Sequence, residues 1–179
     1  MVGRAAALCA AALISAGTAT AAGTTWDKNA GWLRNQIESC AQRAGAFTCT
    51  YFPARALNQL FGIDAFCDAD RCRRAHEIAA EIAQDAQWIA LGKASDQAVL
   101  TQAQEMATGG LPVIAVQVSA DTGLIAIVMP GKAVTSQSWR RKVPLAVGAR
   151  LDRPEASVYG QGLNFLFSDP AKVTLYVQK

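Results

Sequence analysis

The sequence predicts a single α+β domain in which helices from the first half pack on an antiparallel sheet built mainly from the second half. From about residue 24 to residue 108, apolar residues recur at helical spacing. After Gly110 the chain becomes rich in valine and isoleucine, in short runs separated by turn residues. Helices followed by strands are typical of the α+β class. No repeat or Ser- or Pro-rich linker divides the chain.

Residues 1–21 have the features of a secretory signal peptide. Arg4 precedes an apolar stretch over residues 5–16, and Ala19-Thr-Ala21 offers the small residues of a cleavage site. The apolar stretch is too short and too rich in alanine to span a bilayer. We therefore expect a periplasmic or secreted protein that lacks a membrane span after cleavage, with residues 22–179 forming the single domain.

The overall charge excludes some partner classes. With 17 basic and 14 acidic residues the formal net charge is only +3, which favours neither nucleic acid nor a membrane surface as a dedicated partner. No phosphate-binding loop or nucleotide motif is present, so no cofactor is expected.

Four amphipathic helices are predicted. The first begins near Thr24 or Thr25, carries apolar residues to about Ala41 and is broken at 44–46. The second covers about 50–61, because proline is tolerated in a first turn and Gly62 is a natural terminator. The third begins near Arg73 and presents Ile78, Ile82 and Ala86, and the fourth follows a Ser95-Asp96 cap and ends at Gly109-Gly110.

The strands are predicted from β-rich runs. Leu111–Ser119 and Leu124–Met129 flank the turn at 120–123 and read as an antiparallel hairpin. Val173–Val177 alternates with period two and forms a last strand. Tyr159–Phe167 is a further candidate that contains two glycines.

Four cysteines follow the leader: Cys40, Cys49, Cys67 and Cys72. In an oxidising compartment they suggest two disulfides, and three pairings are possible. Cys67 and Cys72 bracket a turn and favour a local bridge, which leaves the state of Cys40 and Cys49 open. A metal site that combines Cys67, Cys72 and His76 fits no common zinc spacing, and no metal site is expected.

Two motifs carry the chemistry. The first runs from Cys49 to Gly62 and opens a helix with a cysteine, as Cys-x-x-Phe-x-x-x-x-Leu-x-x-x-x-Gly. The second is Gly123-Leu-Ile-Ala-Ile-Val-Met-Pro-Gly131. Together they resemble the NlpC-type papain-like cysteine hydrolases, which cut peptide bonds in bacterial cell walls. The resemblance extends over about Phe47 to Val177 and implies a papain-like fold with Cys49 as nucleophile.

The sequence departs from this family at the base. Where the family has a histidine that opens the strand, this chain has Leu124, which cannot accept or donate a proton. The single histidine, His76, belongs to a different predicted element. Thr135, Ser136 and Gln137 are the polar candidates for a third site residue, and Trp139, beside a basic run, is a weak candidate for ligand contact.

Three functions follow as hypotheses. The first is a catalytically degenerate NlpC-like domain that binds peptidoglycan peptides or regulates cell-wall hydrolysis. The second is an active cysteine amidase or endopeptidase in which Cys49 works with a non-standard base. The third is a disulfide-stapled secreted factor that binds another protein. A disulfide between Cys40 and Cys49 would exclude the second, because a nucleophile needs a free thiol.

Overall fold

The computed structural model describes residues 18–42, 47–69, 71–119 and 122–179. Over these residues the α-helices are α1 (Thr18–Gln42), α2 (Phe47–Thr50), α3 (Phe52–Phe61), α4 (Ala75–Ile82) and α5 (Gln97–Thr108). Short 3₁₀ helices are η1 (Pro154–Ala156), η2 (Leu163–Phe165) and η3 (Pro170–Lys172).

The strands form one large antiparallel sheet and one small one. The six-stranded sheet has the order β1-β8-β2-β3-β6-β7. Its members are β1 (Trp88–Lys93), β2 (Val113–Val118), β3 (Gly123–Val128), β6 (Leu145–Gly148), β7 (Val158–Gly162) and β8 (Thr174–Gln178). A separate two-stranded sheet pairs β4 (Val134–Ser136) with β5 (Arg141–Val143).

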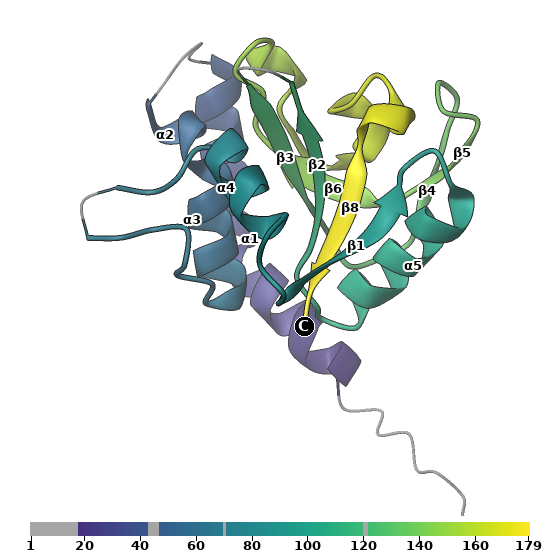
Figure 1. Ribbon diagram of the computed structural model, residues 1–179, viewed down its shortest axis with the longest axis horizontal. Helices are drawn as coiled ribbons and strands as arrows, with labels where there is room; N and C mark the ends of the chain where they lie inside the picture. Colours follow the sequence, from purple (N-terminus) through teal and green to yellow (C-terminus); the bar gives the residue numbers. More distant parts are fainter. Residues whose placement is uncertain (1–17, 43–46, 70, 120–121) are drawn as a thin grey trace, which may run out of the picture.

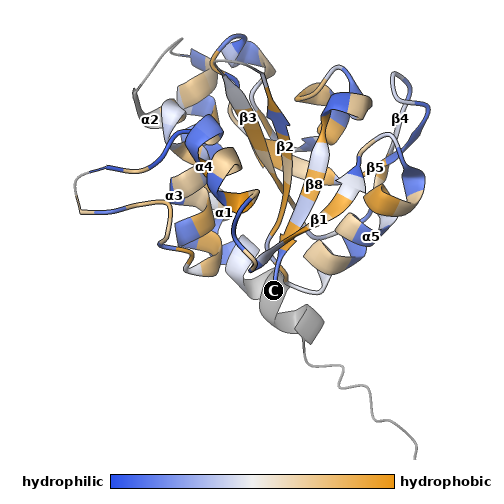
Figure 2. Cartoon of the chain, viewed as in Figure 1, coloured by the Kyte–Doolittle hydropathy of each residue, from blue (hydrophilic) through white to orange (hydrophobic). Residues whose placement is uncertain are grey.

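Helices cover both faces of the large sheet. The helices α1, α3 and α4 lie on one face and α5 lies on the other (Figure 1). The strands β2 and β3 between these layers are predominantly apolar (Figure 2). Because successive side chains of a strand point to opposite faces, each strand contributes side chains to two hydrophobic cores.

We call these the first and second core clusters. On β3, Ile125 and Ile127 belong to the first cluster, whereas Ala126 and Val128 belong to the second. The first cluster contains apolar residues of α1, α2, α3 and α4, including Leu33, Cys40, Cys49, Phe52, Leu57 and Ile78. The second contains residues of α5 and of the later part of the chain, including Leu100, Ala103, Trp139, Leu163, Phe167 and Leu175.

The α+β class and the predicted hairpin are confirmed. Strands β2 and β3 pair antiparallel from Val118↔Gly123 to Ile114↔Ile127. Gly62 ends α3 in the left-handed region with φ 68°, and the Asp96 carboxylate accepts a hydrogen bond from the Ala98 N–H at the start of α5. These ends are local signals, which explains why the sequence located them.

The sequence interpretation was wrong in four places. The helix predicted over 50–61 is interrupted at Tyr51, so Cys49 lies in α2 and α3 begins at Phe52. The strand β1 lies between α4 and α5, so the helices do not all precede the strands. Ala86 lies beyond the end of α4 and is exposed. The candidate strand at 159–167 forms β7 only as far as Gly162 and then becomes η2.

The predicted leader falls largely outside the described residues, which begin at Thr18. The helix α1 starts at Thr18, before the expected cleavage point after Ala21. The predicted breaks at 44–46 and 120–121 also lie outside the described residues. Among the helices in the described part of the chain, none combines the length and apolarity needed to cross a membrane.

Candidate functional site

A pocket of about 220 Å³ lies at one end of the large sheet. One side is formed by Cys49, Thr50 and Pro53 near the start of α3, together with Ala75 of α4. The other side is formed by residues of the β2–β3 hairpin and by the segment 149–152 that follows β6. The two residues that the sequence singled out, Cys49 and Leu124, therefore border the same pocket although they lie far apart in the chain.

The sulfur of Cys49 is not a thiol. Cys49 forms a disulfide with Cys40 of α1, with the two Cα atoms 5.5 Å apart, and both residues are buried. The second disulfide joins Cys67 and Cys72, as the sequence predicted for this turn. A bridged sulfur cannot act as the nucleophile, since acyl transfer requires the thiolate.

Leu124 belongs to β3, but its side chain lies on the other face of the sheet from Cys49. It packs against the second core cluster, whereas Cys49 and the next residue, Ile125, belong to the first. Leu124 pairs with Gln117 of β2, which places these two side chains on the same face. Leu124 thus borders the pocket without directing its side chain at Cys49.

The pocket opens where two neighbouring strands separate. Strand β3 pairs with β6 only through Ile127↔Val147 and Val128↔Ala146, followed by a 2.8 Å hydrogen bond from the Met129 N–H to the Leu145 C=O. Two residues further toward the pocket, Ile125 lies opposite Ala149, but these two residues do not form a β-bridge. Both residues line the pocket.

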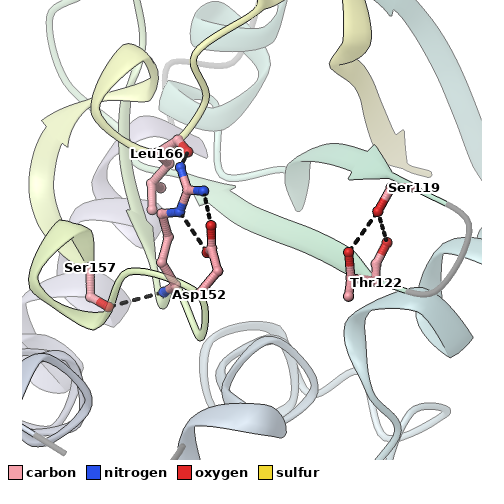
Figure 3. Close-up of polar contacts among 6 residues, drawn as sticks. Ser119, Thr122, Asp152, Ser157 and Leu166 are labelled. Carbon is pink, nitrogen blue, oxygen red and sulfur yellow. Dashed lines mark hydrogen bonds and ion pairs between the residues drawn. The ribbon is translucent and has the colours of Figure 1, made fainter. Parts of the chain in front are cut away.

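A partly buried arginine, Arg150, holds one wall of the pocket. The Arg150 side chain, only 13% exposed, donates from Nε and Nη2 to the two Asp152 carboxylate oxygens at 3.0 and 2.5 Å. Its Nη1 donates to the Leu166 C=O at 2.6 Å, and its backbone N–H donates to the Ser157 hydroxyl at 3.0 Å (Figure 3). The hydrogen bonds from Arg150 outweigh burial and lower the pKa of Asp152. Asp152 is therefore ionised at neutral pH and is a weak base.

Hydroxyl groups hold the hairpin at another part of the pocket. The Ser119 and Thr122 hydroxyls are 2.6 Å apart, and the Ser119 hydroxyl also donates to the Thr122 C=O at 3.2 Å (Figure 3). The Ser119 N–H donates to the same carbonyl at 2.9 Å. Sequence reasoning did not identify Ser119, Thr122, Arg150 or Asp152, because no motif marks them and only the folded sheet brings them together.

The other predicted candidates lie elsewhere. Trp139 is 5% exposed and belongs to the second core cluster, so it serves packing and is not a surface available for ligand contact. Ser136 is buried on β4, where its hydroxyl accepts the Trp139 N–H at 3.1 Å, and it is not part of the pocket wall. His76 is exposed on α4. Within the described residues, no group of three or more His, Cys, Asp or Glu is arranged to hold a metal.

Neither a scan of protein-family models nor a search of curated proteins finds a match to this chain. The resemblance to the NlpC-type hydrolases therefore depends on the two sequence motifs alone.

Proposed function

We propose that this protein is an exported, catalytically inactive NlpC-like domain whose pocket at Cys49 binds peptides of the bacterial cell wall. One observation carries the proposal. The residue in the nucleophile's motif borders a pocket together with the residue in the base's motif, while its sulfur is bonded to Cys40. The resemblance implies that the family's site lies at this pocket, where the sulfur of Cys49 is bonded to Cys40 and is not a reactive thiol.

The chemistry of the pocket wall supports binding without catalysis. Its ionisable side chains, apart from the bridged Cys49, are Arg150 and Asp152, which neutralise each other. General acid–base catalysis works best with a group whose pKa lies near the working pH, and the hydrogen bonds from Arg150 move the pKa of Asp152 further below that range. The remaining wall combines apolar side chains such as Leu151 with hydroxyl and amide groups, a mixture suited to a short peptide.

The cellular location of such a ligand agrees with the predicted export. Two disulfides are the form expected for cysteines in an oxidising compartment such as the periplasm. Peptidoglycan, or a protein bound to it, is the partner that the NlpC-like resemblance implies for a protein exported there.

Binding and hydrolysis can be tested side by side. The exported protein is titrated with soluble peptides released from purified sacculi, by calorimetry, and is separately incubated with intact sacculi whose fragments are read by mass spectrometry. We expect saturable binding and no cleavage. Cleavage by the wild type that is lost in Cys49→Ala would instead establish the active hydrolase.

A matched pair of variants locates the binding. Thr122 is an exposed residue at the rim of the pocket, so Thr122→Trp narrows the entrance without disturbing the core. Thr101 is exposed on α5, on the other face of the sheet, and Thr101→Trp makes the same change away from the pocket. Only Thr122→Trp is expected to weaken binding. Equal affinities for the two variants, or no binding by the wild type, would refute the proposal.

A further inference from the structure

The backbone of β3 beside the pocket has a regular pattern of hydrogen bonds that stops early. In an antiparallel pair, the residues whose N–H and C=O groups point to the partner strand recur every second position. The hydrogen bond from Met129 to Leu145, and the pairing of Ile127 with Val147, place these odd-numbered residues of β3 toward β6. The next residue in this series is Ile125, and its counterpart after β6 is Ala149.

The Ile125 and Ala149 backbone groups have no hydrogen-bond partner among the described residues. The ladder between β3 and β6 ends at Ile127↔Val147, and no turn, loop or side-chain hydrogen bond involves either residue. On its other side β3 bonds to β2 through the even-numbered residues, so β2 does not satisfy Ile125 either.

Buried backbone N–H and C=O groups that lack a hydrogen-bond partner destabilise the fold unless a ligand or solvent pairs with them. Ile125 is 1% exposed and Ala149 is 7% exposed, and buried backbone N–H and C=O groups are nearly always paired in folded proteins. Both residues line the pocket, and the strand geometry directs their unpaired backbone groups toward the gap between β3 and the segment after β6. The pocket therefore presents donors and acceptors spaced as in a strand edge.

We propose that the pocket recognises the main chain of an extended peptide, whose N–H and C=O groups pair with Ile125 of β3 or with Ala149 after β6. This inference rests on the proposed function and specifies that the pocket binds the main-chain N–H and C=O groups of a wall peptide. Extended peptides commonly bind by adding to an exposed strand, with main-chain hydrogen bonds giving affinity. Here the free edge lies inside the sheet, where β3 and β6 diverge, and Ser119–Thr122 and Arg150–Asp152 border it.

Amide hydrogen exchange of the wild-type protein tests the pairing directly, without a variant that might fail to fold. The Ile127 amide, which is already paired with Val147, serves as the internal control. Before ligand is added, the Ile125 and Ala149 amides should exchange faster than the Ile127 amide. With bound peptide, exchange at Ile125 or Ala149 should slow by about tenfold or more, while the Ile127 amide changes far less.

Two probes separate this inference from the proposed function: the peptide pool released from sacculi, and a synthetic pentapeptide of alternating threonine and valine. Protection of Ile125 or Ala149 by the wall peptides supports both ideas. Wall peptides that bind by calorimetry without protecting either amide overturn the pairing and leave the proposed function standing. Protection by the synthetic peptide alone supports the pairing but not a wall ligand. If neither probe changes either amide, the pairing is refuted.

Discussion

The disulfide between Cys40 and Cys49 decides which chemistry is open to this protein, so it is the first feature to test. We expect residues 22–179, unfolded in guanidinium without reductant, to show no free thiol from their four cysteines. After reduction, four thiols should titrate. Mass spectrometry of unreduced peptides should join Cys40 to Cys49 and Cys67 to Cys72.

The structure also gives a magnitude for each bridge. The Cys40–Cys49 bridge closes a sequence separation of 9, for which the loop-entropy relation gives about 2.5 kcal/mol of stabilisation, and the Cys67–Cys72 bridge closes a separation of 5, which gives about 2 kcal/mol. The deeper burial of the Cys40–Cys49 bridge increases the expected difference in stabilisation between the two disulfides. Cys40 and Cys49 are 3% and 4% exposed in the first core cluster, whereas Cys67 and Cys72 are only partly buried beside it.

Paired alanine variants in urea measure these values without leaving an unpaired thiol. We expect the variant that lacks both Cys40 and Cys49 to lose more free energy of unfolding than the variant that lacks both Cys67 and Cys72. The opposite order would contradict the packing argument. Two reactive thiols in the untreated protein, one of them at Cys49, would refute the disulfide itself and restore Cys49 as a candidate nucleophile.

Three further predictions concern the pocket wall. A Cβ at Gly123 would lie 2.7 Å from a backbone nitrogen of α4, so Gly123→Ala should lower the free energy of unfolding by about 1–3 kcal/mol. As the control, Gly31→Ala on α1, where no atom lies within 4 Å of the added Cβ, should be neutral or stabilising in the same urea assay. Leu124→His combined with Cys40→Ala should not cleave sacculi, because the side chain at 124 faces the second core cluster; cleavage seen by mass spectrometry would show that it reaches Cys49. The lowered pKa means that Asp152 binds fewer protons in the native protein than in the unfolded chain, so its carboxylate stabilises the fold above the unfolded pKa of about 3.8, and this stabilisation is lost as the pH falls through the native pKa. Asp152→Asn should abolish that part of the acid dependence of the unfolding free energy. An unchanged dependence of the unfolding free energy on pH would contradict the prediction.

The parts of the fold that sequence reasoning located are those specified by local chemistry. The end of α3 at Gly62 and the start of α5 at Asp96 each depend on a residue whose conformation or side chain ends or caps a helix. The β2–β3 hairpin was found because its strands are adjacent in sequence and rich in β-branched residues. The turn disulfide at Cys67 was found for the same reason of proximity.

The parts that sequence reasoning missed depend on contacts distant in the chain. Among the described residues, β1 pairs only with β8, which lies at the other end of the sequence, so no partner strand near β1 in the chain marks it as a strand. Arg150 and Asp152 follow β6 in a short segment without periodicity, and their role appears only when β6 lies beside β3. The break at Tyr51 could not be predicted because the apolar spacing of α3 continues across it.

The alternation of β3 explains why a leucine suits position 124. In a strand buried on both faces, neighbouring residues are committed to different cores, and a shift of one residue exchanges the two sets. With Ile125 and Ile127 in the first core cluster, position 124 must serve the second, where an apolar side chain gains stability from burial and an ionisable histidine would lose hydration. A histidine there has no thiolate to pair with while Cys49 is bonded to Cys40. The disulfide and the leucine are therefore mutually consistent: with the sulfur of Cys49 bonded to Cys40, a histidine at position 124 would have no thiol to activate, and both residues border the same pocket.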